Sequence, residues 1–444
     1  MSEYIKDIDF RASAILEKNI QKGFTQNNPK AKYFYICPSI PEYQHQWLWD
    51  SCFHIIVNSH LNIEYTKREF ETLLKLQEDN GFLPHMYYWK GNITQIDQLV
   101  RKYYQFLSKS SITQTPLLAD ALYSIYRKEK NTEYIRKNID AVRNFYDFLY
   151  TTRRNPVDPV ALLNIVHVWE SGIDNSPIYD APLNIDSSKK KLQSQWIKAI
   201  LEQLNVLNKC DWDMEKIFEM NFFLFKDILF NCTFIEGYRL LAELYSHLEE
   251  NREAETCINR ADELETILIR EFWDKEEGLF FGTYGNENKT NKVKTSLSLI
   301  PLILTNLPQN IAATLVFDHL LNEEEFWSDF PIPSVALNEP TFSDQETGLL
   351  WRGPSWININ WFIIKGLKKH GFENVALQLA QRTFELIEKS GFSEYYHPQT
   401  GEAMGARDFS WSTLVIDIKK QLFDFDLDFI FDKEWTRIKR LPGF

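Results

Sequence analysis

The stretch HVWESGIDNSP, residues 167–177, combines two acidic side chains with turn-forming and aromatic residues. It is too polar for a core element and too aromatic for an ordinary loop. Asp174 follows a turn that contains Gly172, so its side chain is expected to project from a loop. Partial burial beside Trp169 would raise the pKa of such a carboxyl group, as proton donation near neutral pH requires. Asp174 is therefore a candidate general acid, although aspartates in such loops are more often turn or cap residues.

A second carboxyl group with a suitable setting lies far along the chain, in FSEYYHPQTGE. Here Glu394 is flanked by two tyrosines, in a stretch too rich in turn residues for a plain helix. Two carboxyl groups are the minimum for hydrolysing a glycosidic bond, because one protonates the leaving oxygen while the other activates water or attacks carbon. Glu394 is the candidate partner of Asp174. Spacing alone does not exclude three competitors, Glu170, Glu402 and Asp408.

Aromatic residues gather in the same stretches as the candidate acids. The chain has 13 Trp and 20 Tyr, and several lie beside Gly, Pro and Asn. Flat rings next to polar groups suit sugars, whose C–H faces stack on rings while their hydroxyls form hydrogen bonds. The candidate stacking residues are Trp47, Trp49, Trp169, Trp351, Trp356 and Trp411. Arg352, between two of these tryptophans, would add a fixed positive charge.

Asp50, which ends the motif WLWD, has two equally weighted interpretations. Its carboxylate can accept two sugar hydroxyl hydrogens at once, or it can cap the helix that begins at SCFHIIVN. Histidines also lie near the unusual stretches, among them His85, but none forms an HExxH or another tight ligand pair. The sequence therefore predicts no metal site.

The overall charge and the missing motifs exclude several classes of function. A formal net charge of −13 argues against nucleic acid or an anionic membrane as the main partner, because either would require a basic face. The phosphate-binding motifs GxGxxG and GxxxxGK[ST] are absent, and so is GxSxG of serine hydrolases. We therefore predict no cofactor and expect a small carbohydrate as the partner. The sequence does not indicate an oligomeric state.

The cellular location is predicted from cysteine usage and hydropathy. The chain has five cysteines, an odd number, and no CxxC pair. This pattern favours a reducing cytoplasm over a disulfide framework. The opening MSEYIKDIDF lacks the pattern of a signal peptide, and no stretch reaches the ~18 apolar residues of a spanning helix. We expect a soluble cytoplasmic protein.

Helical periodicity dominates the rest of the chain, and strands are marginal. Apolar residues recur at helical spacing in segments predicted as helices at 5–20, 64–77, 116–128, 132–150, 191–208, 213–231, 233–248, 252–272 and 372–389. The segment 25–32 is expected to be a polar loop, and 277–292 a short hairpin or exposed loop. Short connections alternate with long, aromatic ones, as expected when helices pair as hairpins in a ring with a site at one end. We predict an all-α helical toroid that forms a single domain over residues 1–444.

Six motifs, taken together and in order, resemble glycoside hydrolase family 63. They are QWLWDS (46–51), NGFLPHM (80–86), TQTP (113–116), WESGIDNSP (169–177), WRGPSWININ (351–360) and EYYHPQTGEAMGARDFSWS (394–412). Each motif alone is weak, but together they cover almost the whole chain. The compact length most resembles the bacterial mannosylglycerate and glucosylglycerate hydrolases within that family.

The resemblance implies an (α/α)6 barrel and hydrolysis with inversion at the anomeric carbon. It assigns the general acid to Asp174, the general base to Glu394 and a grip on sugar hydroxyls to Asp50. It also implies that Tyr43 and Gln114 help to hold substrate. The other motif residues expected at the sugar site are His85, Gly172 and the six tryptophans named above, together with Arg352.

The expected function is therefore an inverting α-glycosidase acting on a small α-glucoside or α-mannoside, such as glucosylglycerate or mannosylglycerate. Two alternatives remain open. One is an α-glucosidase for neutral gluco-oligosaccharides. The other is a non-hydrolytic sugar-binding protein or a sugar epimerase with the same ring of helices.

Overall fold

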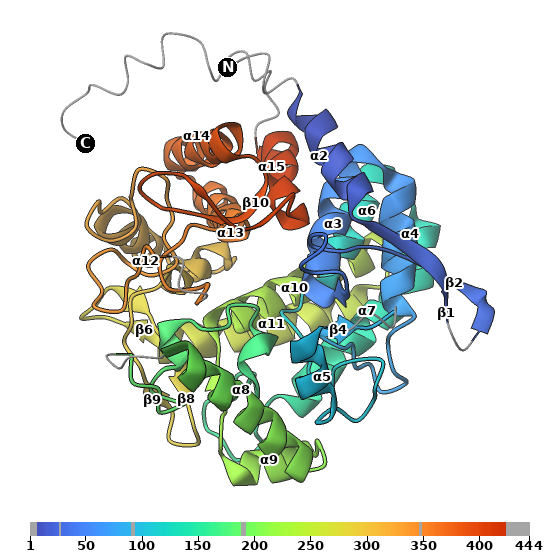
Figure 1. The fold of residues 1–444 in the computed structure, drawn as a ribbon, viewed down its shortest axis with the longest axis horizontal. Coiled ribbons are helices and arrows are strands. Elements are labelled where there is room, and N and C mark those ends of the chain that lie inside the picture. Colours follow the sequence, from blue (N-terminus) through green and yellow to red (C-terminus); the bar gives the residue numbers. More distant parts are fainter. Residues whose placement is uncertain (1–6, 26–27, 90–93, 188–191, 346–348, 423–444) are drawn as a thin grey trace.

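Helices make up most of the protein, as the predicted all-α class requires, although short strands are also present (Figure 1). A computed structural model describes residues 7–25, 28–89, 94–187, 192–345 and 349–422. The α-helices are α2 (Ile8–Lys18), α3 (Leu48–Leu61), α4 (Ile63–Leu74), α5 (Gln95–Arg101), α6 (Leu118–Glu129), α7 (Thr132–Thr152), α8 (Leu192–Lys209), α9 (Met214–Met220), α10 (Ile228–His247), α11 (Asn251–Phe272), α12 (Gln309–Thr314), α13 (Ile357–Lys369), α14 (Glu373–Ser390) and α15 (Val415–Asp417). Shorter 3-10 helices are η1 (Val168–Glu170), η2 (Pro177–Tyr179), η3 (Ser296–Ile303) and η5 (Ser410–Leu414), and π-helical turns are η4 (Leu315–Leu320) and η6 (Ile418–Leu422).

Short antiparallel strands join the helices. Their pairings are β1 (Ile20–Thr25) with β2 (Asn28–Ile36), β3 (Gln46–Trp47) with β4 (Met86–Tyr87), β6 (Trp273–Asp274) with β7 (Leu279–Phe280), β10 (Ser393–Tyr396) with β11 (Ala403–Arg407), and β5 (Phe225–Lys226) with β8 (Thr283–Tyr284) and then β9 (Lys289–Thr290). Of the two forms predicted for 277–292, a short hairpin or an exposed loop, the pairing of β8 with β9 confirms the hairpin. Two pairs, β3–β4 and β10–β11, carry candidate site residues.

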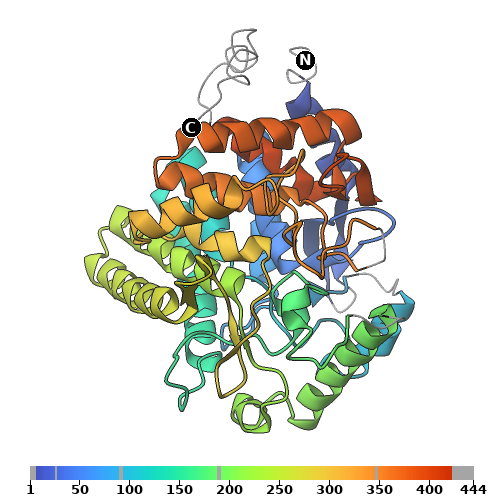
Figure 2. The ribbon, with the colours of Figure 1, turned by 90° about the vertical axis from the view of Figure 1, so that its left-hand side faces the viewer.

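Consecutive helices pack as antiparallel hairpins: α3 with α4, α6 with α7, α10 with α11, and α13 with α14. Figure 2 shows α10 and α11 side by side, in yellow-green at its left. The first helix of a hairpin is the more deeply buried one, and in α3 every residue from Leu48 to Ser59 is buried. The second helix is amphipathic, and α11 buries one face that includes Cys257, Leu264 and Leu268. This difference separates an inner set of helices from an outer set.

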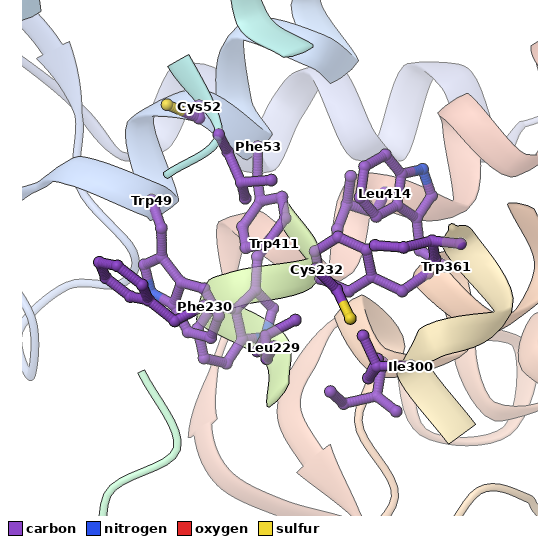
Figure 3. Packing of buried hydrophobic residues seen from close by; sticks show 14 of the residues in the cluster. Trp49, Cys52, Phe53, Leu229, Phe230, Cys232, Ile300, Trp361, Trp411 and Leu414 are labelled. Atoms are coloured by element: carbon purple, nitrogen blue, oxygen red, sulfur yellow. The ribbon is translucent and has the colours of Figure 1, made fainter. Parts of the chain in front are cut away.

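The inner elements converge on one core. Figure 3 shows apolar side chains from α3, α10, η3, α13 and η5 pointing toward one another. Trp49 and Phe53 of α3 contact the Trp411 ring of η5, and Phe53 also contacts Trp361 of α13. One large cluster of buried apolar residues runs from Ile8 to Ile418, in addition to two much smaller ones. The first and the later inner elements therefore share one core.

Early and late segments also meet at the surface, where α2 lies beside η5 and α15 (Figure 1). The Lys18 ammonium pairs with the Asp408 carboxylate at 2.5 Å. The Asn19 side-chain amide donates to the Asp408 carbonyl at 2.9 Å and to the Ser410 hydroxyl at 2.8 Å. These contacts join the segment before β1 to the segment that carries η5.

Most predicted helices are confirmed, with small changes at their ends, but the helix predicted over 213–231 is wrong. The helix α9 ends at Met220, where Asn221 adopts a left-handed backbone with φ of 46°. Asp227 then caps α10, because its carboxylate accepts a hydrogen bond from the Phe230 amide at 2.8 Å. The continuous α10 also removes the predicted break near 232. Residues 5, 6 and 191 of the predicted helices lie outside the described residues.

The polar loop predicted over 25–32 is also wrong, because β1 and β2 form an antiparallel hairpin there; residues 26 and 27 lie outside the described residues. The run Tyr33, Phe34, Tyr35 and Ile36 is buried and favours a strand. Tyr33 stacks on Trp89 at 4.8 Å between ring centroids, and the Arg68 guanidinium lies over the Phe34 ring. None of the described helices has both the length and the apolar content to cross a membrane.

Candidate active site

A cavity of about 260 Å³ opens where the loops before α3, after β4, around η1 and before η5 meet. Its lining contains every predicted site residue except Arg352. The predicted residues that line it are Tyr43, Trp47, Trp49, Asp50, His85, Gln114, Trp169, Gly172, Asp174, Trp351, Trp356, Glu394 and Trp411. The structure thus brings together two candidate catalytic carboxyl groups that lie far apart in the sequence.

Glu394 lies in β10, and its side chain is 4% exposed. One carboxylate oxygen, Oε1, accepts a hydrogen bond from the Tyr43 hydroxyl at 3.0 Å, and Oε2 accepts one from the Ala406 amide at 3.0 Å. Burial is the main cause that raises the pKa of Glu394 to about 7, while the two hydrogen bonds oppose the shift. The group therefore changes charge near neutral pH.

Asp174 lies in the loop between η1 and η2, next to Asn175, which has a left-handed φ of 66°. Burial raises the pKa of its carboxyl group to about 6. Within the described part of the chain, the only hydrogen bond that stabilises this carboxylate comes from the Asp174 backbone. A partly buried carboxyl group with few hydrogen-bond donors is suited to holding a proton.

Glu170, the other acid of the same stretch, is fully buried and supports the loop. Both of its carboxylate oxygens meet the Arg153 guanidinium, at 2.5 and 3.3 Å. The same oxygens accept hydrogen bonds from the amides of Thr113 and Val166, at 3.1 and 2.8 Å. With these donors in place, Glu170 holds η1 against neighbouring segments and does not line the cavity. This arrangement separates Glu170 from Asp174, as spacing alone could not.

Asp50 lies in the first turn of α3 and does not cap it, because the N-cap residue is Trp47. Burial raises the pKa of Asp50 to about 7. Its Oδ1 atom is buried and has no hydrogen-bond partner among the described residues, so it is free to accept one from a ligand. The capping contact comes from Gln114, whose Oε1 accepts a hydrogen bond from the Trp49 amide at 3.0 Å. Gln114 thereby fixes the start of the helix that carries Asp50.

The three carboxyl groups of Asp50, Asp174 and Glu394 share the cavity and repel one another's negative charge. Both aspartates add to the rise in the pKa of Glu394. In the described residues, no three His, Cys, Asp or Glu side chains are grouped so that they could hold a metal ion. Protonation can relieve the repulsion instead of a metal ion, because each bound proton removes one negative charge.

Stacked and edge-on rings form the walls of the cavity. The Trp351 and Trp356 rings stack with centroids 3.7 Å apart, and Trp411 meets Trp356 edge-on at 5.7 Å. Trp49 packs edge-on against Trp411 at 5.4 Å. A Cβ at Gly172, whose φ is 77°, would lie 2.6 Å from the Trp49 ring. Glycine is therefore required at this position of the loop that carries Asp174.

His85 is buried in the wall, parallel to the Trp169 ring at 6.1 Å between centroids. Burial lowers the pKa of His85 to about 3, so the imidazole is neutral at physiological pH. Its Nδ1 has no hydrogen-bond partner among the described residues. A neutral imidazole can donate or accept one hydrogen bond to a sugar hydroxyl at this nitrogen, depending on its tautomer.

Arg352 does not line the cavity, contrary to its predicted place among the substrate-binding residues. It is 3% exposed, and its guanidinium pairs with the Asp180 carboxylate while lying 5.7 Å from the centroid of the Trp196 ring. A buried guanidinium needs a carboxylate partner, and Asp180 supplies it within the protein. Arg352 thus ties the segment after Trp351 to the loop at η2.

Several lining residues were not identified from the sequence. They are Pro38, Glu42, His45, Met86, Thr94, Asp97, Val100 and Phe409. His45 and Asp97 face each other with Nε2 and Oδ2 3.2 Å apart, and Thr94 caps the helix α5. Most lie within or beside the motifs already quoted, and this position in the sequence could have identified them as site residues. Thr94, Asp97 and Val100 lay in no motif, and only the fold brings them to the cavity.

A cavity that holds two carboxyl groups with raised pKa values between aromatic walls, in a mostly helical protein, defines a glycoside hydrolase. Comparison with known proteins identifies which kind. The chain belongs to the family described as the mannosylglycerate hydrolase MGH1-like glycoside hydrolase domain, whose model matches residues 43–412. This match confirms the resemblance seen in the six motifs.

Similar proteins match along nearly their whole length. A mannosylglycerate hydrolase from Thermus thermophilus is 28% identical over 90% of this chain and 98% of its own. A glucosylglycerate hydrolase from Mycolicibacterium hassiacum is 23% identical over 84% of this chain and 91% of its own. The crystal structure of a family 63 mannosylglycerate hydrolase from Thermus thermophilus, in complex with Tris and D-glycerate, superposes with a TM-score of 0.79 at 27% identity, covering 93% of this chain and all of that one.

Proposed function

We propose that this protein is an inverting α-glycosidase that hydrolyses a small α-glycoside of glycerate, either the mannoside or the glucoside. The observation that carries the proposal is the placement of Asp174 and Glu394 in one cavity with aromatic walls. Family 63 enzymes act with inversion, and relatives that match nearly the whole chain are named for hydrolysis of mannosylglycerate and glucosylglycerate.

In this proposal Asp174 protonates the glycosidic oxygen while Glu394 removes a proton from a water on the opposite face of the sugar. Inversion requires a gap of roughly 6.5 to 9.5 Å between the two carboxyl groups, so that the water fits. Asp50, with an unpartnered buried oxygen, accepts hydrogen bonds from sugar hydroxyls. The sugar stacks against the tryptophan walls, and His85 contributes one further hydrogen bond.

Hydrogen bonding supports this assignment of roles. Glu394 accepts hydrogen bonds at both oxygens, as an ionised base does, and Tyr43 and Ala406 hold it in place. The pKa values alone would place a shared proton on Glu394, at about 7, ahead of Asp174, at about 6. In the substrate complex, a glycosidic oxygen beside Asp174 and a water beside Glu394 would favour the proton on Asp174. The protonated Asp174 then donates a hydrogen bond to the glycosidic oxygen, and the ionised Glu394 accepts one from the water.

The pH dependence of kcat/KM is expected to be bell-shaped, with its maximum between the two pKa values of about 6 and about 7. Below about pH 6 both carboxyl groups are protonated and no base is available, so activity falls as pH falls. Above about pH 7 both are ionised and no acid is available, so activity falls as pH rises. Initial rates at constant ionic strength from pH 4 to 9 test this. A flat profile across that range would contradict the proposed pair.

We further propose that the helical hairpins close as an (α/α)6 ring that forms a single domain over residues 1–444. The division into inner and outer helices and the large apolar cluster that spans Ile8 to Ile418 support it. We also propose a cytoplasmic location, which the five free and buried cysteines support, because they fit a reducing compartment.

A screen of α-glycosides with proton NMR of the products tests the function directly. We expect release of mannose or glucose from the α-glycosides of glycerate, with the β-anomer formed first. An α-anomer formed first would contradict inversion. Binding of sugar without release of product would favour the sugar-binding alternative, and a change of configuration without bond cleavage would favour an epimerase.

A second candidate function is an α-glucosidase for neutral gluco-oligosaccharides. It is favoured by the described lining of the cavity, which includes no lysine or arginine to meet a glycerate carboxylate. Arg352, the predicted cation, is paired with Asp180 instead. Glucose released from neutral disaccharides, with no activity on glycerate glycosides, would establish this alternative.

A further inference from the structure

The strand pair that carries Glu394 contains a β-bulge at that residue. Ser393 of β10 pairs with Arg407 of β11, and Tyr395 pairs with Met404. Glu394 is the one residue between these pairs on β10, whereas Gly405 and Ala406 both lie between them on β11. An extra residue on one strand bends it and re-aims the neighbouring groups, and such bulges often lie beside active sites.

The extra residue turns an amide toward the carboxylate of Glu394. Ala406, the second residue of the bulge, donates its amide hydrogen to Oε2 at 3.0 Å. The Tyr43 hydroxyl donates to Oε1 at 3.0 Å, from a different part of the chain. The two donors hold the two oxygens from separate directions, so the direction of the carboxylate depends on the geometry of the bulge.

Gly405 is the residue that this geometry requires. Its φ is 67°, in the left-handed region that favours glycine. A Cβ at Gly405 would lie 2.6 Å from Oε2 and 3.0 Å from Cβ of Glu394, and it would also overlap the Tyr395 ring. No real Cβ tolerates such contacts, so the carboxylate would have to move, or the bulge would have to open.

We propose that Gly405 is a positioning residue for the hydrolytic reaction, which sets the location and direction of the Glu394 carboxylate by leaving the space beside it empty. The proposal rests on the proposed role of Glu394 as the base. Gly405 touches no substrate atom in this role. It acts through Glu394 by excluding a side chain from one side while its neighbour Ala406 binds the same oxygen.

The chain offers a matched control for the cost of a left-handed backbone. Gly371, at the end of α13, has a φ of 79°, and a Cβ there would meet nothing within 4 Å. Gly371→Ala therefore adds the same backbone strain without a collision. A difference between Gly405→Ala and Gly371→Ala reports the contact with Glu394 and Tyr395.

Gly405→Ala is expected to lower kcat on the glycoside by about 100-fold, because displacing a catalytic group by about 1 Å has an effect of this size. KM should change by less than about threefold, since the sugar contacts at Asp50 and the tryptophans are retained. Gly371→Ala should stay within about twofold of wild type in both constants. Equal decreases of kcat in the two variants, or a rise in KM with kcat unchanged, would overturn the proposal.

A double-mutant cycle with Glu394→Ala separates positioning from general damage. Once the carboxylate is absent, Gly405→Ala should change the residual rate on an α-glycosyl fluoride by less than about twofold. A further 100-fold loss in that background would overturn the proposal. If Gly405→Ala alone is insoluble, recovery of soluble protein on adding Glu394→Ala supports the collision with Glu394, whereas recovery only on adding Tyr395→Ala, which removes the neighbouring ring, contradicts it.

An NMR titration of the Glu394 carboxyl carbon gives a readout that needs no turnover, with Glu394→Gln used for assignment. Gly405→Ala should raise the pKa of Glu394 above its wild-type value, because the hydrogen bond from Ala406 that favours the charged form is lost. An unchanged titration would overturn the positioning role. A wild-type protein that hydrolyses no α-glycoside, but whose Glu394 titration shifts in Gly405→Ala, would contradict the proposed function and leave the positioning of Glu394 supported.

Discussion

Asp174→Asn is expected to lower kcat/KM on a glycerate glycoside by about 10³-fold, while activity on the corresponding α-glycosyl fluoride stays within about tenfold of wild type. General acid catalysis contributes about 10² to 10⁴ to a rate. An amide cannot supply the proton that the glycosidic oxygen needs as its bond to carbon breaks. Fluoride leaves without protonation, so the fluoride substrate bypasses the missing acid and leaves the base in use.

Initial rates on both substrates, with the product anomer assigned by NMR, check this prediction. The pH profile of Asp174→Asn on the fluoride should keep its fall below about pH 6–7, where Glu394 is protonated, and lose its fall at higher pH. An equal loss on both substrates would show that Asp174 does something other than protonate the leaving group. Thermal unfolding of the variant controls for loss of fold.

Glu394→Gln is expected to lower activity on both substrates by about 10³-fold or more, because each requires a water that has been activated by a base. Glutamine keeps the shape of the side chain and can still accept a hydrogen bond from Tyr43 or Ala406. We therefore expect kcat to decrease much more than KM changes. Rates on the glycoside and the fluoride, measured side by side, separate this variant from Asp174→Asn.

Glu402 provides a matched control, since it lies in the same motif but is exposed to solvent. Glu402→Gln should stay within about twofold of wild type on both substrates. A large loss in Glu402→Gln, together with retained activity in Glu394→Gln, would transfer the role of base to Glu402. Retained activity in both Asp174→Asn and Glu394→Gln would favour the epimerase alternative.

The sequence predicts the parts of the site that lie in contiguous motifs, because each motif brings its turn formers, rings and acids together. Asp174 and Glu394 could be named for this reason, and so could most of the cavity wall. The choice of Asp174 over Glu170 needed the structure or the family resemblance. Only the fold shows that the Glu170 carboxylate accepts hydrogen bonds from Arg153 and from two backbone amides.

The sequence predictions are wrong where a residue's position depends on a contact with a residue far away in the sequence. Arg352 was expected at the substrate, but its partner Asp180 lies 172 positions away in the sequence. The strand at Tyr33–Ile36 is stabilised by contacts with Trp89 and α4, which local periodicity does not show. The need for glycine at position 405 depends likewise on the Glu394 and Tyr395 side chains across the strand pair. Helices with a clear amphipathic period were predicted well, since neighbours along the chain determine that pattern.

The burial of α3 on all sides has a consequence for biosynthesis. This helix emerges early from the ribosome, yet its side chains pack against segments made much later: His60 Nε2 lies 2.8 Å from Oδ1 of Asp417, 357 residues further on. Contacts of such sequence separation form slowly, because a long loop must close first. Until α13 and η5 have been translated, the segments that bury Trp49 and Phe53 of α3 in the folded protein are missing. During that interval the nascent chain exposes the kind of surface that chaperones bind and that aggregates form from.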